Sequence, residues 1–433
     1  KNLGGVCLNR GCIPSKAYLH LSHVISDASE SKNFGVSFNE PIIDMNKIYN
    51  WKDSIVRNLN MGIETLAKQR KIKIINGLAS FLSANQLSVK DNQNKQINIE
   101  FDYCIIATGS SPSKLKNFGN QYEKVINSTQ ALSLKKVPKK MLVIGGGYIG
   151  LELGTVYQSF GSQITLAEFS PNLLSMADQD LVNPLLKTLE KKFENIFLST
   201  EVIDLKEKNN MVSVTFNNNN KLFQDSFDMV LTSIGRTPNI KYLDLDKAGI
   251  RTNTKGFIPV NEKRRTIIPN IYAIGDITGN PMLAHKATHE GKVAAENISG
   301  LNSIFKPMAI PSVIYTNPEI AWAGYTESEL KNNKIKYNKA IFPWSASGRA
   351  MTTGSTIGKT KVLTSKDNSK ILGVGICGVN AGELISEAML AIEMGANIED
   401  IGLTIHPHPT LSETIANASE ILTKTITDLY IKN

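Results

Sequence analysis

Short apolar runs that end in glycine recur along the chain, and they predict buried strands. Residues 101–112 and 227–238 resemble each other, because each has an apolar run, then a glycine, and then a turn that contains proline. Residues 141–144 form a similar run that leads into the sequence Gly-x-Gly-x-x-Gly, and residues 271–276 form one that ends in Gly-Asp. Helical spacing follows the last two runs, which predicts two strand–loop–helix units.

The glycine-rich sequence at residues 145–150 predicts a dinucleotide site. A strand precedes it, a helix follows, and the next apolar strand ends at Glu168. In this motif Gly145 makes the tight turn, Gly147 lets the backbone approach a pyrophosphate, and Gly150 lets the helix lie close to the sheet. Glu168 is expected to accept a hydrogen bond from the ribose 2′-hydroxyl. This favours NAD over NADP, because a 2′-phosphate would meet a carboxylate.

The repeat at residues 101–112 predicts a second unit of this kind. Since the copy at 227–238 closes a unit that opens with a glycine fingerprint, the first copy is expected to close one too. No such fingerprint lies between residues 1 and 101. We therefore expect the chain to lack the first strand, glycine loop and helix of that unit.

Two cysteines, Cys7 and Cys12, lie five positions apart in a run that opens a helix. On a regular helix this separation is roughly 8–9 Å, whereas a disulfide needs Cα atoms within about 7 Å. Gly11 allows the loosened turn that a bond would require. A helix N-terminus stabilises a thiolate and favours a bond that opens and closes. Two buried structural thiols are the alternative, and zinc would need further ligands at close spacing. Cys104 and Cys377 are isolated in apolar runs and are interpreted as core residues.

The composition is that of a globular protein with two to four domains in 433 residues. The formal net charge is +9, but the lysines are scattered and no arginine-rich run occurs, which argues against a nucleic-acid partner. The sequence contains no run of 18 apolar residues, so no membrane-spanning helix is predicted.

The order of these motifs resembles that of the flavin-dependent disulfide oxidoreductases over essentially the whole chain. The segment at residues 406–413, His-Pro-His-Pro-Thr-Leu-Ser-Glu, is similar to the bacterial dihydrolipoyl dehydrogenases in particular. The resemblance implies an α/β fold with two Rossmann-like dinucleotide-binding domains, for FAD and NAD, and an α+β dimerisation domain. The implied boundaries are 1–137 for the FAD domain, 138–266 for the NAD domain, 267–308 for a central domain that completes the FAD site, and 309–433 for the interface domain. It also implies a cytoplasmic homodimer that serves the lipoyl-bearing acyltransferase of 2-oxo acid dehydrogenase complexes.

The resemblance further implies a role for each matching residue. Cys7 would be the outer thiol, which exchanges with dihydrolipoamide, and Cys12 the inner thiol, which faces the flavin. Lys16, paired with Glu152, would approach the N5 side of the flavin, and Asp276 would bind the ribityl chain of FAD. The rest of the implied cofactor-binding set comprises Thr108, Gly109, Gly235 and Ala284, together with Gly145, Gly147, Gly150 and Glu168.

The C-terminal segment would supply the acid–base group. By resemblance, His408 would be the acid–base residue and Glu413 would orient it, and both would come from the partner subunit. From spacing alone, Thr410 to Glu413 forms a helix capping box, which favours Glu413 as a cap. His406 is interpreted as a histidine that packs or bonds to the backbone.

Two alternatives remain open. A glutathione- or mercuric-reductase-like enzyme would use NADPH and would be expected to have basic residues near position 168. Mercuric reductases also carry a C-terminal cysteine pair that this chain lacks. Tyr148 nevertheless resembles the residue found at this position in glutathione reductases, whereas dihydrolipoyl dehydrogenases commonly have an aliphatic residue at this position. The other alternative is a truncated, non-catalytic dimeric protein, because the ADP half of FAD would have no phosphate cradle without the first glycine loop.

Overall fold

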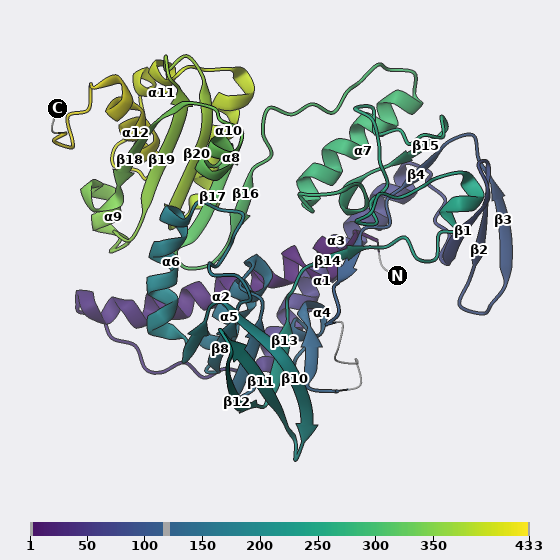
Figure 1. The fold of residues 1–433 in the computed structure, drawn as a ribbon, viewed down its shortest axis with the longest axis horizontal. Helices are drawn as coiled ribbons and strands as arrows, with labels where there is room; N and C mark the ends of the chain where they lie inside the picture. The colour runs from purple at the N-terminus through teal and green to yellow at the C-terminus, as the bar shows by residue number, and fades with distance from the viewer. Residues whose placement is uncertain (1–2, 116–121, 432–433) are drawn as a thin grey trace. The chain divides into compact units, whose positions relative to one another are not determined.

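The structure of the protein, a computed structural model, describes residues 3–115 and 122–431. It contains two compact units, each assembled from three stretches of the chain (Figure 1). Unit 1 comprises Lys1–Pro14, Lys47–Lys114 and Ile234–Lys306, and unit 2 comprises Ser15–Asn46, Leu115–Ser233 and Pro307–Asn433. The four domain boundaries expected from the sequence differ from this contact-based division and stay a prediction.

Unit 2 contains the predicted strand–glycine loop–helix fold. Its parallel sheet has the order β6-β13-β7-β8-β9, and the apolar residues of β7 are buried, as expected for a strand covered on both faces. An antiparallel meander, β10-β11-β12, shares a core with this sheet. The elements are α2 (Cys12–Glu30), η1 (Ser31–Phe34), β6 (Val125–Asn127), α4 (Ser128–Ala131), β7 (Lys140–Ile144), α5 (Tyr148–Ser159), β8 (Gln163–Ala167), α6 (Gln179–Lys192), β9 (Asn195–Phe197), β10 (Thr200–Lys208), β11 (Met211–Asn218), β12 (Lys221–Phe227) and β13 (Met229–Thr232).

The C-terminal part of unit 2 is a five-stranded antiparallel sheet, β16-β17-β20-β19-β18, against which α10 and α12 pack. Trp344, fully buried, donates a hydrogen bond to Thr360 at 3.0 Å, and Thr360 bonds the Thr414 hydroxyl at 2.8 Å. These bonds fix the start of α12 on the sheet, directly after the segment that carries His408. The elements are β16 (Ser312–Ile314), β17 (Glu319–Gly324), α8 (Glu327–Asn332), β18 (Tyr337–Pro343), η4 (Trp344–Ala346), α9 (Gly348–Thr352), β19 (Lys359–Ser365), β20 (Ile371–Gly378), α10 (Ala381–Met394), α11 (Ile398–Leu403) and α12 (Glu413–Thr423).

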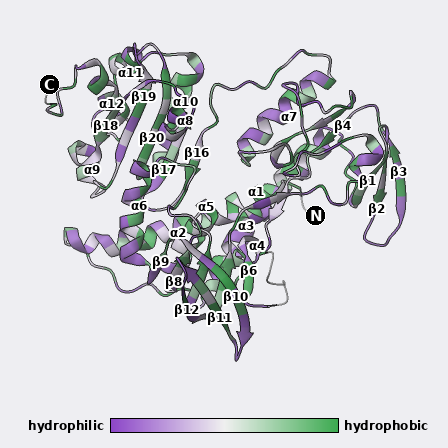
Figure 2. Ribbon diagram, in the orientation of Figure 1, coloured by the Kyte–Doolittle hydropathy of each residue, from purple (hydrophilic) through white to green (hydrophobic). Residues whose placement is uncertain are grey.

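Unit 1 pairs the turns of the two copies of the sequence repeat. The turn of the first copy forms β5 and that of the second forms β14, and the two pair antiparallel with Thr237 opposite Ser111. The strands predicted before Gly109 and Gly275 pair with each other as β4 and β15. Helix α7 alternates hydrophobic and hydrophilic residues (Figure 2). The elements are α1 (Gly5–Arg10), α3 (Met45–Gln69), β1 (Leu78–Ser83), β2 (Gln86–Lys90), β3 (Gln96–Glu100), β4 (Cys104–Ile106), β5 (Ser110–Pro112), β14 (Arg236–Pro238), η2 (Leu245–Ala248), β15 (Ile271–Ala273), η3 (Gly275–Thr278) and α7 (Ala284–Ile298).

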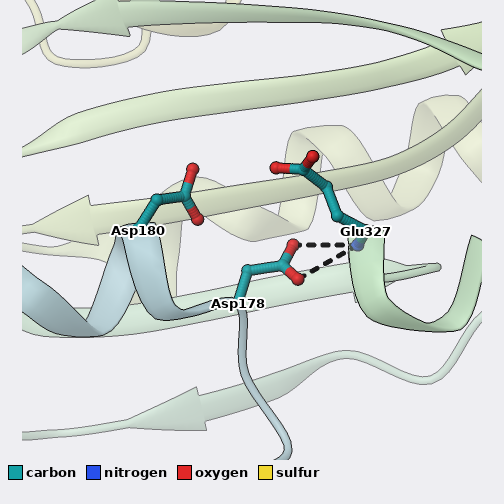
Figure 3. A group of neighbouring side chains, drawn as sticks. All are labelled: Asp178, Asp180 and Glu327. Atoms are coloured by element: carbon teal, nitrogen blue, oxygen red, sulfur yellow. Dashed lines mark hydrogen bonds between the residues drawn. The ribbon is translucent and has the colours of Figure 1, made fainter. Parts of the chain in front are cut away.

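A buried ion cluster in unit 2 joins α6 to the antiparallel sheet. Asp178, Asp180 and Glu327 lie within 4.8 Å of one another, and both Asp178 carboxylate oxygens accept from the Glu327 backbone N–H at 3.0 Å (Figure 3). Three carboxylates at this spacing could hold a metal ion, but the Lys361 ammonium lies among them. Its Nζ is 2.6 Å from Asp178, 2.7 Å from Asp180 and 3.2 Å from Glu327. The cluster is therefore interpreted as a structural ion network.

Replacing Lys361 with methionine is expected to destabilise unit 2 by about 3–5 kcal/mol, since it leaves carboxylates without their buried counter-ion. Burial by itself raises the pKa of Glu327, but hydrogen bonds from Tyr337 and the Lys361 charge bring that pKa down to about 2. Because the folded-state pKa is depressed, Glu327 stabilises the fold above its unfolded pKa, and this stabilisation is lost as pH falls toward 2. Urea unfolding at pH 7 and pH 3 measures both effects.

Lys331→Met is the matched control, since the Lys331 side chain is 68% exposed and its Nζ lies 3.9 Å from the Glu327 carboxylate. An exposed pair contributes less than about 1 kcal/mol. Equal unfolding midpoints for the two variants would show that the Lys361 network does not stabilise unit 2.

Candidate functional site

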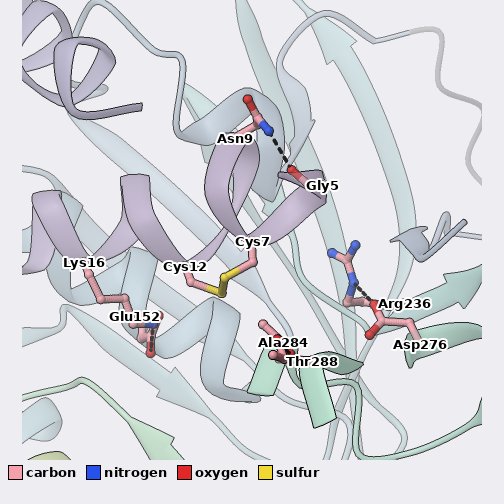
Figure 4. Close-up of a disulfide and its surroundings, with 10 residues drawn as sticks. All are labelled: Gly5, Cys7, Asn9, Cys12, Lys16, Glu152, Arg236, Asp276, Ala284 and Thr288. Atoms are coloured by element: carbon pink, nitrogen blue, oxygen red, sulfur yellow. Dashed lines mark hydrogen bonds and ion pairs between the residues drawn. A yellow bond between two sulfur atoms is a disulfide. The ribbon is translucent and has the colours of Figure 1, made fainter. Parts of the chain in front are cut away.

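The structure joins Cys7 and Cys12 in a disulfide (Figure 4). Their Cα atoms are 4.6 Å apart, well under the separation that a regular helix would give. The shortening comes from Gly11, whose non-helical backbone (φ −143°, ψ −111°) separates α1 from α2. The loosened turn expected from the sequence is therefore confirmed.

Asparagine side chains hold the helix that carries Cys7. Asn9 donates to the Leu3 carbonyl at 2.7 Å and to the Gly5 carbonyl at 2.9 Å (Figure 4). Asn60, on α3, donates to the Asn9 side chain at 2.9 Å. Cys7 is half-buried and Cys12 is exposed, so the disulfide is within reach of a thiol in solution.

The two other cysteines lie in strands and differ from this pair. Burial raises the pKa of the Cys104 thiol to about 11 and that of Cys377 to about 12. Both thiols therefore stay protonated near neutral pH and are poor nucleophiles. Cys377 is fully buried, as the sequence predicted for a core residue, and Cys104 is half-buried.

Lys16 and Glu152 form an ion pair within unit 2 (Figure 4). Lys16, one turn after Cys12 on α2, places its Nζ 2.9 Å from both carboxylate oxygens of Glu152. Glu152, on α5, is 3% exposed, and its Oε1 also accepts from the backbone N–H of Tyr315 at 3.1 Å. The buried carboxylate is thus paired and hydrogen-bonded, the condition under which a charge is tolerated in a protein interior.

Asp276 lies in η3, which follows β15 in unit 1, and contacts the paired repeat turns. Its Oδ2 accepts from the Ser110 hydroxyl at 2.5 Å and lies 4.0 Å from the Arg236 guanidinium (Figure 4). Arg236 also donates to the hydroxyl and carbonyl of Ser110, at 2.7 and 2.8 Å. Neither Ser110 nor Arg236 was among the site residues predicted from the sequence. The repeat was the available signal, since it places them at equivalent positions of the two turns.

The other predicted cofactor-binding residues of unit 1 lie on the paired turns and at the start of α7. Thr108 donates from its hydroxyl to the Asn239 carbonyl at 2.8 Å, which ties the strand end before Gly109 to the turn after Gly235. Ala284 begins α7, and Leu283 before it provides no capping side chain. The first N–H groups of a helix favour polar or anionic groups when no side chain caps them.

The glycine loop of unit 2 fits a dinucleotide. A Cβ on Gly145 would lie 2.6 Å from the Ser233 carbonyl oxygen, and one on Gly150 would lie 2.1 Å from the Gly145 carbonyl oxygen, so both positions require glycine. Space is open beside Gly147, the N-cap of α5, as an approaching pyrophosphate requires. Glu168 accepts from the Gly146 backbone N–H at 2.5 Å, which holds its carboxylate beside the loop.

His408 and Glu413 are hydrogen-bonded in unit 2. His408 Nδ1 lies 2.8 Å from Glu413 Oε1, while Glu413 Oε2 accepts from the Thr410 backbone N–H at 2.7 Å. The carboxylate therefore makes the histidine bond and one of the two bonds of the capping box expected from the sequence. Thr410 is not the N-cap, because α12 begins at Glu413 and its N-cap is Ser412, which makes no side-chain capping bond. His408 is 78% exposed at its side chain, whereas His406 is 7% exposed and pairs with Glu387 at 2.6 Å.

The structure divides the predicted residues between the two units. Unit 1 contains Cys7, Cys12, Thr108, Gly109, Gly235, Asp276 and Ala284, and unit 2 contains Lys16, Gly145, Gly147, Gly150, Glu152, Glu168, His408 and Glu413. Among the helices described, none is long and apolar enough to cross a membrane.

Two family models match the chain. Residues 2–291 match the pyridine nucleotide-disulphide oxidoreductase family, and residues 310–419 match the dimerisation domain of the same family.

Curated relatives match over nearly the whole chain. A dihydrolipoyl dehydrogenase of Buchnera aphidicola from Schizaphis graminum is 47% identical over 99% of this chain and 90% of its own length. One from Vibrio cholerae is 46% identical over the same shares. One from Bacillus subtilis is 41% identical over 97% of this chain and 89% of its own length.

Solved structures show the same fold at low identity. LpdA from Mycobacterium tuberculosis gives a TM-score of 0.90 at 21% identity, over 98% of this chain and 92% of that one. The flavoprotein disulfide reductase RclA from Escherichia coli gives 0.85 at 24% identity, over 97% of this chain and 92% of that one.

Proposed function

Because the chain belongs to the pyridine nucleotide-disulphide oxidoreductases, and among them to the dihydrolipoyl dehydrogenases, we propose that its Cys7–Cys12 disulfide oxidises dihydrolipoamide to lipoamide. NAD⁺ is the final electron acceptor. The observation that carries this proposal is the accessible disulfide at the start of α2. The two remaining thiols are held protonated by burial.

The sulfur–sulfur bonds of the exchange form and break between the two cysteines and the substrate dithiol. A thiolate of dihydrolipoamide attacks the Cys7 sulfur, the Cys7–Cys12 bond breaks, and Cys12 leaves as a thiolate. The second substrate thiolate then attacks the sulfur bonded to Cys7, which closes the lipoamide ring and releases Cys7. The electron pair now resides in the two cysteines, and two protons have left the substrate. Bound FAD supplies the chemistry that accepts this electron pair and passes it as hydride to NAD⁺.

We assign the FAD contacts mainly to the Asp276 cluster and the start of α7. Asp276 offers a carboxylate for ribityl hydroxyls, and Ala284 lies in the first turn of α7, whose N-cap residue, Leu283, makes no side-chain capping bond. Thr108, Gly109 and Gly235 hold the two paired turns. Lys16, held by Glu152, would face the N5 side of the flavin.

We assign the NAD contacts to Gly145, Gly147, Gly150 and Glu168. Replacing Glu168 with glutamine is expected to raise the KM for NAD⁺ about tenfold, because a charged hydrogen-bond acceptor is replaced by a neutral amide oxygen. The same change is expected to lower the ratio of kcat/KM for NAD⁺ to kcat/KM for NADP⁺. Steady-state kinetics with both nucleotides measure this, with exposed Glu194→Gln as control. An unchanged nucleotide preference would exclude the role assigned to Glu168.

We further propose a homodimer in which His408 and Glu413 of the partner subunit complete each site. The match to the dimerisation domain supports this, and so does the 78% exposure of His408, which leaves its Nε2 edge accessible to another chain. His408 would take the proton of the attacking dithiol, and the Glu413 carboxylate at 2.8 Å would fix its tautomer.

The substrate dithiol is proposed to be the lipoyl group of a 2-oxo acid dehydrogenase acyltransferase. We place the reaction in the cytoplasm, where thiol pools keep catalytic cysteine pairs cycling. The domain boundaries predicted from the sequence, 1–137, 138–266, 267–308 and 309–433, are retained as part of this proposal.

Substrate comparison tests the proposal. With FAD bound, dihydrolipoamide and NAD⁺ are expected to give NADH at a kcat/KM at least about a hundredfold above that for glutathione disulfide with NADPH. The opposite ratio would indicate a glutathione-reductase-like enzyme. Absence of both activities in a folded, FAD-loaded dimer would favour a non-catalytic protein.

A further inference from the structure

Tyr315 contacts both members of the Lys16–Glu152 pair. The Lys16 Nζ lies 4.4 Å from the centroid of the Tyr315 ring, within the range of a cation–π interaction. The Tyr315 backbone N–H donates to Glu152 Oε1 at 3.1 Å. Tyr315 directly follows β16, so a residue of the antiparallel-sheet region clamps a pair formed by α2 and α5. All of these residues lie in unit 2.

The Tyr315 ring lies close to the start of α10. Gly382, in the first turn of α10, lies so near that a Cβ there would be 3.4 Å from the ring atom Cε1. The Gly382 N–H donates to Glu319 at 2.9 Å. Burial raises the pKa of Tyr315, and the Glu319 and Glu383 carboxylates raise it further, so its hydroxyl stays neutral.

Lys16 is more exposed than the carboxylate with which it pairs. Its side chain is 32% exposed, whereas that of Glu152 is 4% exposed. A lysine side chain has four rotatable bonds, so the ion pair alone leaves the ammonium several positions around a fixed carboxylate. A ring that covers one side of the ammonium removes part of this freedom.

We propose that Tyr315 is a positioning residue for the redox reaction: its ring and backbone N–H hold the Lys16–Glu152 pair in one geometry, and so set where the Lys16 ammonium presents its charge to the flavin. The part that concerns the flavin rests on the function proposed above, whereas the clamp on Lys16 rests on contacts within unit 2. The ring face acts in this role, and the hydroxyl does not. Replacing Tyr315 with phenylalanine should therefore preserve the contact with Lys16, and replacing it with leucine should remove that contact.

The first test measures the clamp without the cofactor reaction. The rate at which acetic anhydride acetylates Lys16 in the folded full chain is followed by mass spectrometry for the wild type, Tyr315→Leu and Tyr315→Phe. We expect leucine to raise the rate about threefold or more, and phenylalanine to leave it close to that of the wild type. Tyr49→Leu is the matched control, because it removes a tyrosine with a similar cation–π contact, to Lys52 at 4.2 Å, and it should not change Lys16.

The second test measures turnover of dihydrolipoamide by the FAD-loaded variants. Tyr315→Leu is expected to lower kcat about tenfold with little change in the KM for NAD⁺, and Tyr315→Phe to restore kcat. Equal losses for leucine and phenylalanine would assign the role to the hydroxyl and overturn the proposal. Unchanged Lys16 acetylation in Tyr315→Leu would overturn it as well.

Lys16→Met separates this proposal from the proposed function. If this variant keeps full turnover while Tyr315→Leu accelerates acetylation, the clamp exists but Lys16 does not serve the flavin, so the positioning role is overturned and dihydrolipoamide oxidation stands. If the wild type itself fails to oxidise dihydrolipoamide, the proposed function fails, and the acetylation result still decides the clamp.

Discussion

Replacing Cys12 with serine is expected to lower dihydrolipoamide-dependent NAD⁺ reduction by roughly 10³-fold or more, as when one member of a catalytic unit is lost. Without its sulfur no disulfide can form with Cys7, so the substrate dithiol has no bond to open. Serine is close to cysteine in size, and Cys12 lies at an exposed position, so the fold should persist. The measurement is kcat with saturating dihydrolipoamide and NAD⁺ on the FAD-loaded protein.

Cys104→Ser is the matched control, because it makes the same change at a thiol whose pKa burial raises to about 11. It should retain most of the turnover. NADH oxidation by an artificial one-electron acceptor gives a second readout, since electrons from NADH need not pass through the cysteines to reach it. If Cys12→Ser keeps this activity and loses turnover of dihydrolipoamide, the loss lies in the disulfide. Turnover retained by Cys12→Ser would contradict the role assigned to the pair.

Replacing His408 with glutamine is expected to lower the same turnover by about 10²–10⁴-fold, the usual contribution of a positioned acid–base group. Glutamine keeps a polar side chain near Glu413 but cannot exchange a proton near neutral pH. Because His408 is 78% exposed, the change should leave the stability of the protein close to that of the wild type. Turnover and the urea midpoint are measured together, so that chemistry and folding are separated.

His406→Gln is the matched control two residues away. His406 is 7% exposed and pairs with Glu387 at 2.6 Å, so its replacement should affect the stability of the segment more than catalysis. Glutamine retains a donor for Glu387. Equal losses of turnover for the two variants would reject His408 as the acid–base group.

The local features of the site could be predicted from sequence spacing. The glycine loop, the strand before it and the helix after it lie within 20 residues. β7 has nearly the expected bounds, α5 follows the loop as expected, and β8 ends one residue before Glu168. The loosened turn at Gly11 could also be predicted, because five residues of regular helix cannot bring two sulfurs together. The two uses of Glu413 were considered as alternatives, and the structure shows the histidine bond together with one of the two capping-box bonds, because a carboxylate has two oxygens. The start of α12 differs from the expected one, since its N-cap is Ser412 and not Thr410.

The contacts that hold the site are long-range, and no local pattern predicts them. Ser110 and Asp276 are 166 residues apart in the sequence, and Glu152 and Tyr315 are 163 apart. Tyr315 gave no signal, since an aromatic residue after an apolar run is ordinary in a buried strand. No sequence feature distinguishes Lys361 from the many other lysines, and only the fold shows that its side chain is 1% exposed and lies among three carboxylates.

The most direct test of the account is to reduce the FAD-loaded protein with NADH and find where the electrons go. One equivalent of NADH is added without oxygen, free thiols are alkylated, and the modified cysteines are located by mass spectrometry. The account predicts NADH-dependent alkylation of both Cys7 and Cys12, with none added at Cys104 or Cys377. Oxidation of NADH that leaves the Cys7–Cys12 disulfide intact would contradict it.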